Sequence, residues 1–272
     1  MQKAYWAFSL LLLLPPFAGK SQVSSNVLWY KEPAREWTEA LPVGNGRLGA
    51  MVFGGVGEEL IQLNESTLWS GGPVPKVINP DAVNHLPEIR KVLLEGDFDK
   101  ASALAKKMQG LFTESYMPLG NLVINQQFKD TTLTQYNRDL NLGSATSSTS
   151  FTVGGESFTR SVFASSPDQV IVVWLTALKP ATLQLKIGAR SPLKHTMLAA
   201  ANNELVMKGR APSHADPSYY NKNREPIIWD DSTGSNCTGM RYEMIVKAVN
   251  TGGTVSTDTS GITIKGASSV VL

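Results

Sequence analysis

Cysteine is almost absent from this chain of 272 residues, in which Cys237 is the single example. One cysteine cannot form an internal disulfide, so the fold must be stabilised by core packing instead of covalent cross-links. A nucleophilic role for Cys237 would require an activating histidine, and the chain has only His85, His195 and His214. We therefore interpret Cys237 as a residue without a catalytic role.

The sequence also lacks an excess of charge of either sign. Its formal net charge is +2, and removal of Lys3 and Lys20 with the N-terminal leader described below leaves 23 basic residues against 23 acidic ones. A protein that binds nucleic acid or an anionic membrane would be expected to carry a concentrated basic face. The charge balance therefore argues against nucleic acid and membrane partners, whereas the 42% hydrophobic content is typical of a folded globular protein.

Long apolar runs are missing except at the N-terminus. The run Ala4–Leu14 follows Lys3 and precedes Pro15, Pro16 and a segment of small residues. It is shorter than the roughly 20 residues that span a bilayer, and its flanks are those of a cleaved leader. The sequence predicts a signal peptide over residues 1–22 and an exported, periplasmic or secreted, domain over residues 23–272.

Short apolar segments separated by turn residues fill most of the remaining chain. Arg47–Phe53 and Glu58–Leu63 flank a glycine-rich turn and predict a hairpin, as do the segments on either side of Gly154 and Gly155. Parallel βαβ alternation is missing, so the pattern favours a mainly β protein built as a large antiparallel sandwich. Further strands are predicted over residues 119–128, 149–153, 157–163, 169–177, 181–187, 204–209, 240–249 and 261–265.

Two helices are predicted as a small insertion between strands. The first has Asn79 as its expected N-cap and Gly96 as its stop, with an apolar side that includes Val83, Ile89, Val92 and Leu93. The second is expected to be capped by Asp97 and to place Phe98, Ala101 and Leu104 on its apolar stripe. The last residues, 268–272, are typical of a strand that is just starting, so we expect the sandwich to be C-terminally truncated.

Six blocks of the sequence closely resemble glycoside hydrolase family 95, the first being Trp37–Gly55 (WTEALPVGNGRLGAMVFGG) and the second Ile61–Pro73 (IQLNESTLWSGGP). The others are residues 116–120, 167–170, 209–212 and 239–242, and they occur in family order over nearly the whole mature chain. Asn121 departs from the pattern, because the family usually has an acid there.

The resemblance implies the incomplete N-terminal β super-sandwich of an α-L-fucosidase-like enzyme, some relatives of which act on α-L-galactosides. Such enzymes hydrolyse terminal residues of glycans with inversion. Their sandwich packs on a downstream (α/α) barrel that carries the general-acid Glu and the base Asp. No position of this chain aligns with those two acids, so the resemblance implies that the chain by itself is inactive and that its partners are the barrel and a fucosylated glycan.

Inverting hydrolysis requires two carboxyl groups roughly 6.5–9.5 Å apart across the scissile bond. Nothing in the sequence makes any two acids face a shared cleft, so we interpret them as surface or turn carboxylates and assign no catalytic residue. The acids in suggestive loops are Glu65, Asp216, Glu225, Asp230 and Asp231.

Asn64, Glu65 and Trp69 follow a predicted strand and are candidates for lining a substrate cleft. An indole face can stack on a sugar while the amide and carboxylate bind its hydroxyls, and loops on rigid strands are common places for such groups. The alternative is a corner in which Trp69 fills the core and Asn64 or Glu65 binds turn backbone. Arg47 is a domain-interface candidate, paired with an acid either of its own domain or of the barrel.

His214 and Trp229 are further cleft-lining candidates, because both belong to a long polar loop that also contains Tyr219 and Tyr220. A metal site would require more convergent ligands than this loop offers, so we expect neither a metal nor a cofactor. The alternative is loop structure without chemistry.

Three functions stay open. The first is the inert N-terminal part of a fucosidase, and the second is a stand-alone carbohydrate-binding sandwich that uses Trp69, Tyr219, Tyr220 and Trp229 as a stacking platform. The third is a structural domain with an exposed apolar interface.

Overall fold

The structure is a computed structural model that describes residues 26–73, 79–110, 114–219, 224–230 and 238–272. The predicted signal peptide and Cys237 lie outside these residues. Within the described ranges no helix has the length and apolar character needed to cross a membrane.

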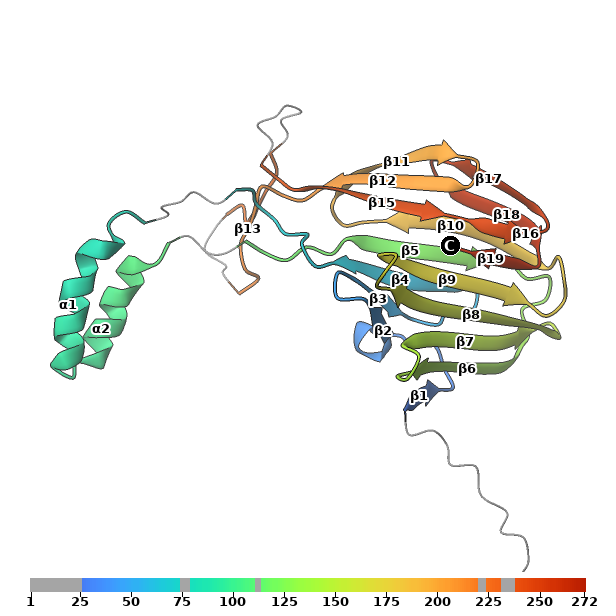
Figure 1. The fold of residues 1–272 in the computed structure, drawn as a ribbon, viewed down its shortest axis with the longest axis horizontal. Coiled ribbons are helices and arrows are strands. Elements are labelled where there is room, and N and C mark those ends of the chain that lie inside the picture. The colour runs from blue at the N-terminus through green and yellow to red at the C-terminus, as the bar shows by residue number, and fades with distance from the viewer. Residues whose placement is uncertain (1–25, 74–78, 111–113, 220–223, 231–237) are drawn as a thin grey trace, which may run out of the picture.

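Two seven-stranded antiparallel sheets form the body of the molecule (Figure 1). The first has the order β1 (Val27–Tyr30), β6 (Leu133–Asn141), β7 (Thr146–Val153), β8 (Glu156–Ser165), β9 (Val170–Ala177), β19 (Ser269–Val271) and β16 (Val249–Thr251). The second has the order β17 (Thr254–Asp258), β18 (Gly261–Ala267), β10 (Leu183–Arg190), β5 (Gly120–Gln126), β4 (Glu58–Glu65), β3 (Leu48–Val52) and β2 (Leu41–Gly44).

A three-stranded sheet and a two-residue strand pair complete the β structure. The sheet contains β11 (Lys194–Ala201), β12 (Glu204–Arg210) and β15 (Arg241–Lys247), and the pair contains β13 (His214–Ala215) and β14 (Ile227–Ile228). Short 3-10 helices occupy Trp37–Glu39 and Lys106–Met108. The antiparallel sandwich that the sequence predicts is confirmed.

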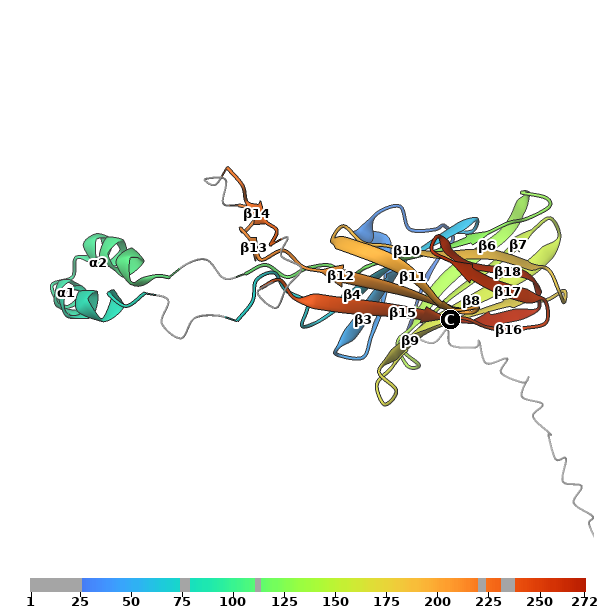
Figure 2. The same cartoon turned by 90° about the horizontal axis from the view of Figure 1, so that it is seen from above.

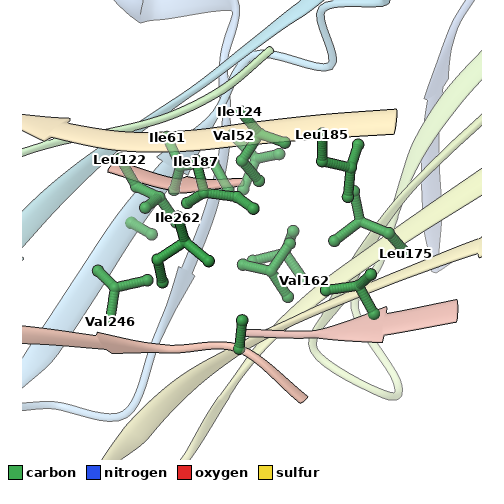
Figure 3. Close-up of a cluster of buried hydrophobic side chains, with 14 of the residues drawn as sticks. Val52, Ile61, Leu122, Ile124, Val162, Leu175, Leu185, Ile187, Val246 and Ile262 are labelled. Carbon is green, nitrogen blue, oxygen red and sulfur yellow. The ribbon is translucent and has the colours of Figure 1, made fainter. Parts of the chain in front are cut away.

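One continuous core fills the space between the two large sheets. Because side chains alternate across a strand, every second residue of β10, namely Leu183, Leu185 and Ile187, is buried. Residues from both sheets meet in this core, among them Ile61 and Ile124 from one side and Val162 and Leu175 from the other (Figure 3).

The core also contains a charged pair. Glu59 of β4 and Arg160 of β8 lie 3.1 Å apart and are nearly inaccessible to solvent. Glu59 accepts a hydrogen bond from the Gly54 amide, while Arg160 donates to the carbonyl oxygens of Gly55 and Val56. This pair joins the first sheet to the β3–β4 turn of the second.

The two predicted helices form a hairpin that stands away from the sandwich in both views (Figures 1 and 2). α1 covers Ala82–Leu94 and α2 covers Phe98–Ala105. The Asp97 carboxylate accepts from the Lys100 amide, which confirms the predicted cap. The N-cap of α1 is Asp81 and not Asn79 as predicted, although Asn79 Oδ1 accepts from the Asp81 amide at 3.2 Å. Asn79 Nδ2 also donates to the carbonyl oxygens of Lys107 and Gln109.

Much of the apolar surface of the hairpin is exposed. Its own small core contains Ile89, Val92, Ala101 and Leu104, with Met108 packed against it. The predicted inward positions of three residues are wrong, because two helices alone bury only one stripe each. Val83, Leu93 and Phe98 are solvent-exposed, as is Leu94.

Eight strands of the described residues were missed by the sequence patterns: β1, β2, β6, β11, β13, β14, β17 and, apart from Val249, β16. β6 and β11 are polar or carry small residues (LTQYNRDLN and KHTMLAAA), so neither shows a clear apolar alternation. The predicted start of a strand near the last residue corresponds to β19.

The buried pair generates a stability prediction. Replacing Arg160 with methionine should lower the free energy of unfolding by about 3–5 kcal/mol, because the Glu59 carboxylate would stay buried without its partner. Urea unfolding monitored by circular dichroism measures this change. Lys179→Met, which removes an exposed pair with Glu156, is the matched control and should cost less than about 1 kcal/mol. Equal effects of the two substitutions would contradict the prediction.

Candidate functional site

The chain turns a corner at the C-terminal end of β4, and this corner contains three of the predicted cleft-lining residues, Asn64, Glu65 and Trp69. Trp69 forms an isolated bridge with Tyr116, and the two rings meet edge to face with centroids 5.5 Å apart. The Tyr116 hydroxyl donates to the Glu65 carbonyl oxygen at 2.9 Å, and the Trp69 indole N–H donates to the Ser66 carbonyl oxygen at 3.3 Å. Trp69 is 43% exposed, and it is its neighbour Leu68, 2% exposed, that enters the core.

Arg47 and Glu65 are bound to each other and to their own domain. Arg47 Nε donates to the Gln169 side-chain oxygen at 2.7 Å, and Arg47 Nη1 lies 3.4 Å from Glu65 Oε1. Glu65 Oε2 accepts from both the amide and the hydroxyl of Thr67. Burial alone would raise the pKa of Glu65, but the hydrogen bonds from Thr67 and Arg47 outweigh it and lower that pKa. Glu65 is therefore ionised at neutral pH and is poorly suited to act as a general acid.

His214 lies on β13 between two carboxylates. Its Nδ1 is 2.9 Å from Glu114 Oε1 and its Nε2 is 2.9 Å from Asp216 Oδ1. The second oxygen of Glu114 accepts from the Ser70 hydroxyl and from the Ala215 amide. We call Ser70, Glu114, His214 and Asp216 the histidine clasp. It joins three chain segments, and it adjoins the corner because Ser70 follows Trp69 in the chain.

The clasp favours the protonated imidazole. Hydrogen bonds to Glu114 and Asp216 raise the pKa of His214, since they outweigh its partial burial. For Glu114, burial would raise the pKa, but hydrogen bonds from Ser70, His214 and Ala215 prevail and lower it. Within the part of the chain that the structure describes, no group of three or more His, Cys, Asp or Glu residues could hold a metal ion.

Trp229 lies apart from this arrangement. It is partly buried against the main core, and the Lys194 ammonium sits 5.0 Å from the centre of its ring. Tyr219 is exposed, whereas Tyr220 and Asp231 lie outside the described residues. The structure thus gathers Asn64, Glu65 and Trp69 with Arg47 and places His214 next to them, but it gives Trp229 a packing position.

A second feature was missed in the sequence: an open cavity of 700 Å³ on the outer face of the second sheet. Across β3, β4, β5 and β10 the directly paired residues are Met51, Gln62, Asn121 and Arg190. Trp37, exposed in the 3-10 helix, also lines the cavity, as do Asn64 and Tyr116. Met51, Gln62, Asn121 and Arg190 thus form a row across the sheet. Only the register of the strands brings them together, so their spacing along the chain does not predict the row.

The row has the composition of a sugar-binding surface. Amide and guanidinium groups bind hydroxyls, and a neighbouring aromatic ring offers an apolar face. Asn121, where the sequence departs from the family pattern, lies in the middle of the row.

A family profile described as "Glycosyl hydrolase family 65, N-terminal domain" matches residues 28–272. The chain belongs to this family. It is 34% identical to alpha-L-fucosidase 2 of Arabidopsis thaliana over 235 residues, which are 84% of this chain and 27% of that protein. It is 35% identical over 176 residues to a probable alpha-fucosidase A of Aspergillus niger, covering 61% of this chain and 21% of that protein.

A third relative, a probable alpha-fucosidase A of Aspergillus oryzae, is 32% identical over 166 residues, with 58% of this chain and 22% of that protein covered. These matches confirm the predicted resemblance to the N-terminal domain of fucosidase-type glycoside hydrolases. The chain spans about a quarter of the length of the curated relatives it matches.

The histidine clasp should be visible in a pH titration. Replacing Glu114 with glutamine should lower the pKa of His214, because one of its two carboxylate partners becomes neutral. Imidazole NMR signals followed against pH measure the change, and Glu243→Gln, distant in the chain, is the control.

The same shift predicts how stability varies with pH. Because folding raises the pKa of His214, its stabilising contribution is complete below the unfolded-state pKa and is lost as pH rises through the folded-state pKa. As pH rises from the unfolded-state pKa of His214 through its folded-state pKa, the free energy of unfolding should therefore fall more for the parent chain than for Glu114→Gln. Identical pH profiles would show that the clasp does not operate in solution.

Proposed function

We propose that this chain is the non-catalytic N-terminal domain of an exported, inverting α-L-fucosidase-like glycoside hydrolase that acts on terminal α-L-fucosides or α-L-galactosides of glycans. Its family membership supports the glycosidase assignment, and the curated relatives point to fucose. The acid and the base would be supplied by a downstream barrel domain.

The state of the described carboxylates is the observation that carries the non-catalytic role. Glu65 and Glu243 both line one cavity, but Glu65 is held ionised and Glu243 forms a 2.8 Å ion pair with Lys208. Glu114 and Asp216 are both bound to His214. An inverting enzyme requires one protonated and one ionised carboxyl group facing the same bond. None of these acids has both the proton and the freedom that a general acid needs.

Exposed apolar surface supports a partner domain. Leu94 and Phe98 of the helical hairpin are 90% and 70% exposed, and Val249, Val271 and Trp174 form an exposed row across β16, β19 and β9. Contiguous apolar surface of this kind is typical of an interface. We assign this apolar surface to contact with the barrel. A purely structural domain would use the same surface in the same way but would not bind a glycan.

Activity measurements on an aryl α-L-fucoside test the proposal. The chain alone should give no turnover above the uncatalysed rate, whereas a version extended through the downstream barrel should hydrolyse the substrate. The barrel produced without residues 26–272 is the control for the contribution of this domain. Proton NMR of the first product should show the inverted anomer. Turnover by the short chain, or release of the retained anomer, would refute the corresponding part of the proposal.

The second candidate function is carbohydrate binding by the domain itself. The outer-face cavity favours it, because Gln62, Asn121 and Arg190 form a polar row beside Trp37. This cavity replaces the platform expected from Trp69 and Trp229, since Trp229 is packed against the core.

Calorimetric titration with fucosylated oligosaccharides tests this second function. The parent chain should bind with millimolar affinity, and Trp37→Ala should weaken binding by at least about tenfold, or about 1.4 kcal/mol. Trp174→Ala removes a similarly exposed tryptophan from the other sheet and should leave the affinity unchanged. Absence of heat at millimolar ligand would eliminate the binding function and leave the fucosidase assignment untouched.

A further inference from the structure

The outer-face cavity of the second sheet carries a positive charge that its own lining does not neutralise. Among the described residues that line it, Arg190 is the one charged side chain. Glu36 and Glu39 stand close to Trp37 in the sequence, but neither lines the cavity. A ligand that enters this cavity therefore meets a cation and no carboxylate.

The guanidinium of Arg190 is available to such a ligand. Arg190 is exposed at the end of β10, and its side chain makes no hydrogen bond or ion pair with another described residue. Its direct neighbour on β5 is Asn121, which is uncharged. Lys186 lies on the same face of β10, since four residues separate the two, yet Lys186 interacts electrostatically with Asp258. The sheet thus supplies an acid to one of these cations and none to the other.

Two amide side chains beside Arg190 also lack partners. Gln62 and Asn121 are half-buried, and neither side chain is hydrogen-bonded to another residue in the part of the chain that the structure describes. Partly buried polar groups usually find a partner, and an amide offers both donors and an acceptor to sugar hydroxyls. Gln62 and Arg190 are two strands apart, so a ligand that reaches both must extend over about 10 Å. That length is greater than one sugar ring and suits an oligosaccharide.

Aromatic rings supply the apolar part of the same cavity. Trp37 is 60% exposed and Tyr116 is 38% exposed, and both line it. Each ring offers a face or an edge against which a sugar can pack. The volume of 700 Å³ is within the usual range for sites that bind small molecules.

We propose that the outer-face cavity binds an acidic oligosaccharide, in which a carboxylate or sulfate group pairs with Arg190 while neighbouring hydroxyls bind Gln62 and Asn121. Both kinds of oxyanion present oxygens that match the planar fork of a guanidinium group. The inference rests on the second candidate function, carbohydrate binding by the domain itself, and adds the class of sugar. A neutral oligosaccharide uses the same amides and rings but leaves Arg190 without an anion, so it binds more weakly.

Calorimetric titration of the full chain at low ionic strength tests the proposal with two pairs of ligands. The first pair is trigalacturonic acid and its methyl ester, and the second is a sulfated fuco-oligosaccharide and its desulfated form. The members of each pair differ only in the anionic group. In at least one pair the charged member should bind at least about tenfold more tightly than the neutral one. The pair that shows the preference distinguishes a carboxylate ligand from a sulfate ligand.

Three variants connect the preference to Arg190. Arg190→Gln removes the charge, and Asn121→Asp places an acid of the chain directly beside it. Either substitution should bring the affinities of the charged and neutral ligands close to each other. Lys186→Gln is the matched control, because it removes a cation from the same face of the same strand without altering the cavity lining. This variant should keep the full preference.

The outcomes separate the inference from the function on which it rests. Equal affinities of the parent chain for the charged and neutral members of both pairs would overturn the inference and leave carbohydrate binding in place. A preference that survives in Arg190→Gln, or that disappears in Lys186→Gln, would also overturn it, because the effect would then come from overall charge. No binding of any of the four ligands would refute the second candidate function as well.

Discussion

The contact on which the rest of the structure depends is the buried pair of Glu59 and Arg160. Arg160 belongs to β8, yet its guanidinium binds Glu59, the carbonyl oxygens of the β3–β4 turn and the Gln126 side chain of β5. A charge in a core is tolerated only when such partners surround it. The cost of burying the pair is therefore offset only when both sheets are in their final positions, which ties β4 to one placement.

The placement of β4 determines the geometry of the site. Glu59 fixes one end of β4, and Glu65 is the last of the eight residues of that strand. Glu65 is bound in turn by Thr67, Arg47 and Tyr116. These contacts attach the corner to the strand and hold it in place. Residues at both ends of this segment therefore have structural roles. The signature identifies the family, but its presence is not evidence that these residues take part in catalysis.

The sandwich was predictable because its strands have apolar alternation and its turns contain glycine. In β10 each second residue is apolar, and in the turn between β7 and β8 Gly154 and Gly155 adopt positive φ angles of 57° and 79°. The helical hairpin was predictable in outline, but the exposure of Phe98 was not, since periodicity cannot say whether a partner covers a helix.

The candidate site was less accessible to sequence reasoning. Asn64, Glu65 and Trp69 are neighbours in the chain, so their convergence follows from local structure. Glu114, in contrast, reaches His214 across 100 residues, and no spacing rule announces such a contact. The row of Gln62, Asn121 and Arg190 is likewise a product of register across three strands.

The cluster of Arg47, Glu65 and Gln169 lies in a groove between β9 and β15. The same groove is lined by Val170–Val173 and Met240–Lys247, and Gln169 directly precedes Val170, the first residue of β9. Arg47 Nη2 also donates to the Gln169 backbone oxygen at 3.2 Å.

Arg47 is bound to Glu65 and Gln169, and Glu65 is bound also to Thr67, so both side chains are held by partners within this domain. At the same corner the rings of Trp69 and Tyr116 are exposed, as is Asn64, so all three offer surface to a ligand. Tyr116 and Asn64 also line the outer-face cavity, so the surface left for ligand is continuous with the polar row on the second sheet.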